Sequence, residues 1–421
     1  MNTGSHNIVL LGYGEENRQF HDWLVGIKKI DPKRIIIADK KTDPKYLEKL
    51  FQPNISKIYK SPGIWSLIPD LEKFRAIHGQ RSVLSPLAPF FEIFRNQIIG
   101  VTGTKGKTTT ASIITHLLKK SGVKVHYCGN TVGISPYQFW TKRDQKVDPD
   151  EYFVVELSSF QLQDLAYSQI SPKYAVITNY YVDHQDHHAS VEEYWAAKDT
   201  IFKWQQEGDF CIKDISPELN VKINQIVKHA LIGDHNKENV SKAVLVVEQV
   251  TGNKLVDFEG CMDDFQSVDH RLQLVRTMHR KDLEIRFYDD GAATEPEAVI
   301  AAVEALTLNN NEKLWLHITG NHKGGDLEKL RNTITVKTQE NALFEVDYCG
   351  EVGQILSNTP DRLNFKRTVS KQFKNLGTKI EELSGVLNIV LSPCGSSFDE
   401  FEDYKKRSQW WIDQVNGINL D

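Results

Sequence analysis

The sequence is poor in cysteine and has no long apolar run, and these two absences exclude several classes of protein. The five cysteines are scattered over 421 residues and show no Cys-x-x-Cys spacing. They predict reduced thiols rather than a disulfide framework or a zinc site. No apolar stretch is long enough to span a bilayer, and the N-terminus lacks the basic and apolar segments of a signal peptide. We therefore expect a soluble protein of the cytoplasm, with no membrane partner.

An excess of basic charge is also missing. The chain has 51 Lys and Arg against 56 Asp and Glu, which gives a formal net charge of −5 at pH 7. This balance argues against a surface for nucleic acid or for an anionic membrane. The length allows two to four domains, each with a full core. Nothing in the sequence demands a partner chain, so we expect a monomer that acts on small molecules.

The strongest motif is a glycine-rich turn between a predicted strand and a predicted helix. The strand is Gln97–Val101 and the helix runs from about Thr108 to Lys120. Backbone N–H groups at such a turn, together with a helix N-terminus, bind phosphate. The general P-loop spelling is not fully met, because Gly100 lies one residue early. We predict an ATP site that is formed by Gly103, Thr104, Lys105, Gly106, Lys107, Thr108 and Thr109.

Alternating strand and helix patterns predict an α/β fold with three domains. Residues 1–96 are expected to form a Rossmann-like N-terminal unit. Residues 97–268 would form a central P-loop domain with a mostly parallel sheet, and residues 269–421 a Rossmann-like C-terminal domain. Each such sheet offers a crevice at the carboxyl ends of its strands, where ligands bind.

The first domain carries a degenerate dinucleotide motif. A strand runs into Gly12-Tyr-Gly14, and the next strand ends at Asp39. This is the arrangement of a Rossmann nucleotide site, but Asn17 takes the place of the third glycine. A nucleotide diphosphate is therefore favoured over NAD.

The central domain offers a carboxylate and a lysine near the predicted ATP site. Glu156 ends a buried strand, so its carboxylate would face the phosphate crevice, where it could bind Mg²⁺. A loop at 179–188 holds five ionisable residues, but their spacing fits no zinc motif. Lys198 lies on a helix that Ser190 would cap, and its position alone indicates only a helix flank.

Four motifs together resemble those of the Mur ligases and the related folylpolyglutamate synthases. The family uses ATP to join an amino acid to a carboxylate. The central motifs are most similar to the branch that adds D-glutamate to UDP-N-acetylmuramoyl-L-alanine during peptidoglycan precursor synthesis. The resemblance implies an ADP-forming ligase that acts through an acyl phosphate. It rests on Thr102-Gly-Thr-x-Gly-Lys-Thr-Thr109, Glu156-Leu-Ser-Ser-Phe-Gln-Leu162, Asn179 with Asp183-His184, and Ala196-Ala197-Lys198.

The resemblance also implies roles for individual residues. The catalytic residues would be Lys107, Glu156, His184 and Lys198, with Lys198 present as a carbamate. Two Mg²⁺ ions would be held by Thr108, Glu156, His184 and Lys198. Further ATP contacts would come from Asn236, Arg271 and Asp290. The substrates would contact Gly12, Asp39 and Ser61 (UDP-sugar), Asn130 and Ser158 (acceptor), and Thr294, Lys323, Ser397 and Tyr404 (incoming amino acid).

One position departs from the family pattern. The family spelling Asp-Ser-Lys-Ala-Thr-Asn is here Asp290-Gly-Ala-Ala-Thr-Glu295, so Ala292 replaces a lysine that helps to bind D-glutamate. The ligase class is unaffected, but addition of another amino acid, such as L-glutamate, to the same acceptor stays open.

Two functions outside this branch also stay open. A folylpolyglutamate-type ligase would lack a UDP-binding unit, against which Gly12, Gly14 and Asp39 speak. A non-catalytic nucleotide-binding scaffold would have no need of Lys107, Glu156 or Lys198, and all three are present.

Overall fold

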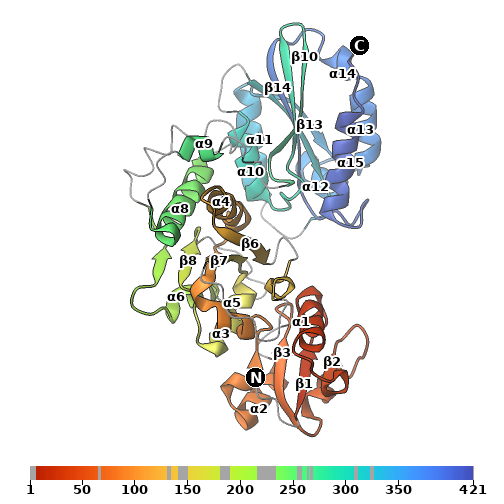
Figure 1. Ribbon diagram of the computed structural model, residues 1–421. Helices are drawn as coiled ribbons and strands as arrows, with labels where there is room; N and C mark the ends of the chain where they lie inside the picture. The colour runs from red at the N-terminus through yellow and green to blue at the C-terminus, as the bar shows by residue number, and fades with distance from the viewer. Residues whose placement is uncertain are drawn as a thin grey trace. The chain divides into compact units, whose positions relative to one another are not determined.

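The computed structural model describes residues 6–64, 68–129, 134–140, 150–180, 190–215, 234–253, 258–262, 265, 269–307, 312–322 and 327–420. The chain divides into two compact units (Figure 1). The first comprises Met1–Ile226 and His235–Phe265, and the second comprises Val227–Asp234 and Gln266–Asp421. Among the described helices, none combines the length and the apolar character that crossing a membrane requires.

The first unit begins with a four-stranded parallel sheet of order β2-β1-β3-β4. Alternate residues of β1 face opposite sides, as the two-residue period of a strand requires. Ile8 and Leu10 pack with helix α1, whereas Val9 and Leu11 pack with helix α2. The elements are β1 (Asn7–Leu11), α1 (Glu15–Gly26), β2 (Ile35–Ala38), β3 (Ile55–Lys60), α2 (Pro69–His78), β4 (Val83–Leu84) and α3 (Ala88–Phe94).

A second sheet of the same unit has five parallel strands in the order β6-β7-β5-β8-β9. Its central strand is buried along its whole length, as an apolar strand covered on both faces should be. The elements are β5 (Ile98–Thr102), α4 (Lys107–Lys120), β6 (Lys124–Gly129), β7 (Glu151–Glu156), α5 (Ser159–Leu165), β8 (Tyr174–Ile177), α6 (Val191–Lys203), β9 (Phe210–Ile212), α8 (Asp234–Thr251) and α9 (Phe258–Met262).

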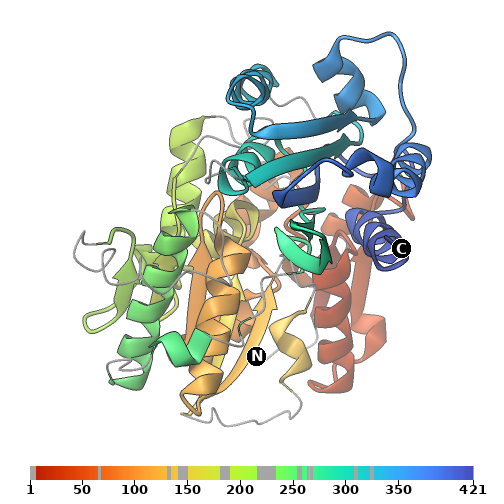
Figure 2. The same ribbon diagram turned by 90° about the horizontal axis from the view of Figure 1, so that it is seen from above.

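Helices cover the second sheet on both faces. Helices α4 and α8 lie side by side (Figures 1 and 2), and Thr110 Oγ1 donates to Asn239 Oδ1 at 3.2 Å between them. Helices α5 and α6 pack together on the other face, where Leu162, Leu165 and Ile201 join the core. Helix α4, which follows the glycine-rich turn, is thus held in place by contacts with its own sheet and with α8.

One apolar cluster joins the first two sheets. It runs from Phe20 and Trp23 of α1 to Phe153 of β7. The Trp23 ring lies 4.8 Å from Tyr137 and 4.4 Å from Trp140, measured between ring centroids. Such aromatic packing buries a large area and explains why the two sheets form one compact unit.

The second unit contains a five-stranded sheet of order β10-β11-β14-β12-β13. All its strand pairs are parallel except β10 with β11. Helices α10 and α11 cover one face, and α13 and α15 cover the other (Figure 1). The elements are β10 (Gln273–Arg280), β11 (Leu283–Asp289), α10 (Pro296–Ala305), β12 (Glu312–Thr319), α11 (Glu328–Gln339), β13 (Leu343–Tyr348), α12 (Gly350–Ser357), α13 (Phe365–Lys374), α14 (Leu376–Lys379), β14 (Gly385–Cys394) and α15 (Tyr404–Asn416).

The predicted α/β class, with mostly parallel sheets, is confirmed. The motif Thr294-Glu-Pro-Glu297 predicts a capping box with Thr294 as the N-cap residue, but this prediction is wrong. The N-cap residue of α10 is Glu295, and its side chain makes no capping hydrogen bond. Strand β10 was not predicted from the sequence; its exposed residues alternate with half-buried ones at an antiparallel edge, so it has no apolar run.

Candidate active site

The glycine-rich turn lies at the carboxyl end of β5, the central strand of the second sheet. Gly103 has φ 147°, and a Cβ atom there would lie 1.8 Å from Thr178 Oγ1. Gly106 has φ 79° and is the N-cap residue of α4. Both positions therefore require glycine. The turn leads directly into a helix N-terminus, whose first N–H groups have no helical acceptor and can bind phosphate oxygens.

Two lysines from distant parts of the sequence meet at this turn. Lys107 Nζ donates to the carbonyl oxygens of Gly103 at 3.0 Å and Thr104 at 2.9 Å. Lys198 is 1% exposed, and its Nζ donates to the same Gly103 oxygen at 2.9 Å. It also lies 4.2 Å from the centre of the Tyr194 ring. The turn thus concentrates positive charge where a phosphate chain would need it.

Residues that follow β8 hold the backbone of the turn. Asn179 Oδ1 accepts from Lys105 N at 2.9 Å, and Asn179 Nδ2 donates to Lys105 O at 3.0 Å. Thr178 Oγ1 also donates to Lys105 O. Tyr194 of α6 donates its hydroxyl to Thr104 Oγ1 at 3.2 Å. These contacts fix the turn in advance of any ligand. Sequence reasoning used Asn179 only as part of a family motif and did not foresee this support.

A carboxylate lies on the neighbouring strand. Glu156 ends β7 and pairs in register with Val101 of β5. Its side chain is 1% exposed, and Tyr127 donates its hydroxyl to Glu156 Oε2 at 2.9 Å. Within the part of the chain that the structure describes, no group of three or more His, Cys, Asp and Glu side chains could hold a metal ion. His184, the other predicted metal ligand on this edge, lies outside the described residues.

Ser158 is the N-cap residue of α5 and lies two residues after the end of β7. Its hydroxyl accepts from Gln161 N at 3.2 Å, and the Gln161 side chain accepts from Ser158 N at 3.0 Å, which completes a capping box. Gln161 Nε2 in turn donates to Glu16 Oε2 of α1 at 2.6 Å. Asn130, the other predicted acceptor contact, lies outside the described residues.

Helix α8 brings an asparagine pair to the turn. Asn239 lies against Gly106, where a Cβ atom would be 2.6 Å from its Oδ1. Asn239 Nδ2 donates to Asn236 Oδ1 at 3.1 Å. Asn236, a predicted ATP contact, is therefore linked to the turn through Asn239.

The predicted UDP-sugar residues gather at the carboxyl ends of the first sheet. Gly12 has φ 74°, and a Cβ atom there would lie 3.0 Å from Ser61 Cβ. Asp39 accepts from the backbone N–H groups of Tyr13 and Lys41. These hydrogen bonds lower the pKa of Asp39. Gly12, Asp39 and Ser61 thus surround one turn, at the place where a nucleotide binds in such folds.

Of the predicted site residues in the second unit, the structure describes five. Asp290 follows β11, and it accepts from Ser392 Oγ at 2.7 Å and from Leu272 N at 3.0 Å. Burial raises the pKa of Asp290 to about 7. Arg271 is exposed, Ser397 is buried, and Tyr404 begins α15. The fifth is Thr294, whose N–H donates to Ala292 O at 3.0 Å.

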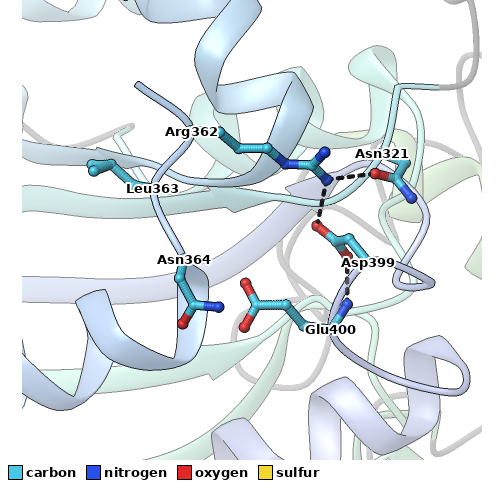
Figure 3. A pocket seen from close by; sticks show the side chains of 6 residues that line it. All are labelled: Asn321, Arg362, Leu363, Asn364, Asp399 and Glu400. Atoms are coloured by element: carbon cyan, nitrogen blue, oxygen red, sulfur yellow. Dashed lines mark hydrogen bonds and ion pairs between the residues drawn. The ribbon is translucent and has the colours of Figure 1, made fainter. Parts of the chain in front are cut away.

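A cavity of about 370 Å³ lies at the carboxyl ends of β12 and β14 (Figure 3). Arg362 Nη2 lies 2.6 Å from Asn321 Oδ1 and 3.4 Å from Asp399 Oδ2. The neighbouring Glu400 carboxylate accepts from two N–H groups at the start of α13. Sequence reasoning missed this cavity. It did single out Ser397, two residues before Asp399, and Lys323, which lies outside the described residues.

Comparison with known proteins gives a consistent result. Residues 101–219 match the family described as the Mur ligase middle domain. The chain is 28% identical over 398 residues to a UDP-N-acetylmuramoylalanine–D-glutamate ligase of Solibacter usitatus, covering 86% of this chain and 84% of that protein. It is 26% identical over 449 residues to the enzyme of the same name from Oenococcus oeni, covering 97% and 96% of the two chains.

Two solved structures share the fold. One is the MurF ligase of Thermotoga maritima in complex with ADP, with a TM-score of 0.53 and 14% identity over 99% of this chain and 97% of that chain. The other is the UDP-N-acetylmuramate–alanine ligase MurC of Thermotoga maritima. Its TM-score is 0.51, with 16% identity over 97% of this chain and 99% of that chain.

Proposed function

We propose that this protein, whose residues 101–219 match the family described as the Mur ligase middle domain, uses ATP to join D-glutamate to UDP-N-acetylmuramoyl-L-alanine in peptidoglycan precursor synthesis. The observation that carries the proposal is the convergence of Lys107 and Lys198 on one carbonyl of a phosphate-binding turn. The similarity to D-glutamate ligases over 86% and 97% of this chain supports the choice of substrates.

The turn would bind ATP through its backbone and through Lys107. A ligase of the same fold carries ADP in its solved structure, which supports the use of ATP here. The residues Gly103–Thr109 would contact the phosphates. Asn236, in the first turn of helix α8, would also contact ATP. The proposed ligands of two Mg²⁺ ions are Thr108, Glu156, His184 and Lys198. Hydroxyl and carboxylate oxygens next to a phosphate site are the donors that Mg²⁺ prefers, and the ions would neutralise phosphate charge.

The reaction would activate a carboxylate. The terminal carboxylate of the acceptor attacks the γ-phosphorus of ATP, the bond to the bridging oxygen breaks, and ADP leaves. Lys107 would stabilise the charge that spreads over the transferred phosphoryl oxygens. The amine of D-glutamate then attacks the acyl carbon, loses a proton, and phosphate departs as the amide forms. His184 is the proposed partner of the tetrahedral oxyanion.

Lys198 is proposed to act as a carbamate. The residue is 1% exposed and its amine lies beside the turn, so its charge would bear directly on phosphate binding. Addition of CO₂ to the neutral amine, with loss of a proton, would convert a cation into an anionic oxygen ligand. That change would supply the oxygen donor that a hard divalent ion needs.

We assign one substrate to each sheet. Residues 1–96 would bind the UDP-sugar, residues 97–268 ATP, and residues 269–421 the incoming amino acid. The first assignment rests on Gly12, Asp39 and Ser61, which surround one turn. The protein would act in the cytoplasm as a monomer on these small molecules.

The identity of the amino acid is the open part of the proposal. Ala292 stands where the resemblance expects a lysine, so a cation for the side-chain carboxylate must come from elsewhere. A second candidate function is therefore addition of L-glutamate to the same acceptor. Thr294, Lys323, Ser397 and Tyr404 are the proposed contacts in either case.

The experiment is a phosphate-release assay with ATP, Mg²⁺ and UDP-N-acetylmuramoyl-L-alanine against amino acids of both hands. We expect release that depends on D-glutamate and is lost in Lys107→Ala. Dependence on L-glutamate would establish the second candidate. Release that no amino acid stimulates would refute a ligase function on this acceptor.

A further inference from the structure

A chain of hydrogen bonds joins the first sheet to the predicted acceptor site. Glu16 lies in the first turn of α1, directly after the Gly12–Gly14 turn. Its Oε2 accepts from Gln161 Nε2 at 2.6 Å. Gln161 Oε1 in turn accepts from Ser158 N at 3.0 Å and from Ser158 Oγ at 3.1 Å. Glu16 therefore reaches Ser158 through a single side chain, although 142 residues (158 − 16) separate them in the sequence.

A buried ion pair lies beside this chain of contacts. Lys60, the last residue of β3, places Nζ 2.7 Å from Asp164 Oδ2 of α5, and the two side chains are 1% and 2% exposed. Lys60 and Asp164 are the charged groups that act on Glu16, one from β3 and one from α5. When Glu16 is ionised, this cluster holds two carboxylates and one ammonium group.

We propose that Glu16 is a positioning residue that holds Ser158 through Gln161, and that binding of the nucleotide-sugar diphosphate at the Gly12–Gly14 turn requires Glu16 to be protonated. The inference rests on the proposed function, because it takes the turn as the diphosphate site.

Electrostatic repulsion explains why binding of the diphosphate would depend on the protonation of Glu16. A diphosphate at the N-terminus of α1 would be repelled by an ionised carboxylate in the first turn. Burial raises the pKa of Glu16 to about 7, despite the neighbouring Lys60. Protonation removes the repulsion and keeps the Gln161 contact, since a neutral carboxyl group still accepts from the amide. Oε1 is a buried atom of Glu16 for which the structure gives no partner, and it could carry the proton.

Linkage gives the sign of the effect. If the diphosphate binds the protonated form, binding takes up a proton, and affinity falls as the pH rises through 7. Between pH 6.5 and 8.5 the protonated fraction of a group that titrates near 7 falls about 25-fold. The affinity for the nucleotide-sugar can therefore fall by at most this factor over the same range.

Calorimetric titration with UDP-N-acetylmuramoyl-L-alanine, without ATP, tests the proposal. Measured at pH 7 in buffers of different ionisation enthalpy, the wild-type protein should take up about half a proton per site. Glu16→Gln should bind with no proton uptake and with an affinity that is independent of pH from 6.5 to 8.5. Gln161→Ala should bind more weakly at every pH, because Ser158 keeps the contact to the backbone N–H of residue 161 but loses the side-chain oxygen that accepts from its N–H and hydroxyl.

Glu15→Gln is the matched control. It makes the same change of charge on the same turn, but Glu15 is exposed and contacts Arg18 and Gln19 instead of Gln161. It should keep the proton uptake of the wild type. Binding without proton uptake in the wild type, or equal effects of the two substitutions, would overturn the inference alone. No binding of the nucleotide-sugar at all would overturn the proposed function together with it.

Discussion

Replacing Gly106 by alanine should damage the ATP site much more than the same replacement at Gly122. The two glycines have nearly the same φ, 79° and 77°, at opposite ends of α4. Alanine at either position must adopt a left-handed conformation, which costs about 1–2 kcal/mol. The two positions differ in their surroundings. A Cβ atom would lie 2.6 Å from Asn239 Oδ1 at Gly106, whereas nothing lies within 4 Å at Gly122.

The additional effect at Gly106 follows from the contacts of Asn239. This side chain is 4% exposed, accepts from Thr110 Oγ1 at 3.2 Å and donates to Asn236 Oδ1 at 3.1 Å. Moving it away breaks these hydrogen bonds inside the protein, at a cost of about 1–3 kcal/mol. Gly106→Ala should therefore lose about 2–5 kcal/mol of stability in total, against about 1–2 kcal/mol for Gly122→Ala.

Urea unfolding gives the two stabilities, and steady-state kinetics with varied ATP gives the functional effect. We expect Gly106→Ala to raise the KM for ATP at least tenfold, because the turn and the start of α4 must shift. Gly122→Ala should leave kcat and KM for ATP as they are in the wild type. Equal losses of stability and an unchanged KM for ATP in both variants would refute the steric reasoning.

Three other substitutions test other parts of the structure. Lys198→Arg keeps a cation but cannot form a carbamate, so phosphate release should fall at least 100-fold. ¹³C NMR with labelled CO₂ should show a carbamate signal in the wild-type protein and none in the variant. Absence of the signal in the wild-type protein would rule out the modification. Lys60→Met should lower the free energy of unfolding by about 3–5 kcal/mol, because Asp164 is left buried without its cation, whereas Lys60→Met with Asp164→Leu should recover most of the loss in urea unfolding. Asp290→Asn should change how the free energy of unfolding depends on pH. Burial raises the pKa of Asp290 from 3.8 to about 7. The contribution of Asp290 to the free energy of unfolding is therefore complete below pH 3.8 and is lost as the pH rises through 7. Relative to wild type, Asp290→Asn should therefore gain at most about 4 kcal/mol between pH 4 and pH 8, and parallel stability curves would contradict this.

The parallel strands and the P-loop could be predicted from the sequence, because buried strands read as apolar runs and the turn needs glycine. Strand β5 was expected at Gln97–Val101 and is found at Ile98–Thr102. Strand β10 escaped prediction because an exposed antiparallel edge has no apolar run. Periodicity placed Lys198 only on a helix flank. That its amine reaches Gly103 O depends on how α6 packs beside β5, which no local pattern encodes.

Contacts between distant segments could not be predicted from the sequence either. The hydrogen bond from Gln161 to Glu16 joins two helices of different sheets. In the sequence, Gln161 looks like a residue of a capping box and Glu16 looks like an acidic residue in the first turn of a helix. Each does have that local role, so neither indicates the contact between them. The cavity around Arg362 has the same origin, because its lining comes from three separate loops at one sheet edge (Figure 3).

The most direct test of carboxylate activation is an isotope experiment. UDP-N-acetylmuramoyl-L-alanine labelled with ¹⁸O in its terminal carboxylate would be incubated with ATP, Mg²⁺ and D-glutamate, and the released phosphate analysed by mass spectrometry. An acyl phosphate transfers one carboxylate oxygen to phosphorus, so each phosphate should carry one ¹⁸O and each product one new amide. Unlabelled phosphate would mean that water, and not the acceptor carboxylate, attacks ATP, and it would contradict the proposed ligase reaction.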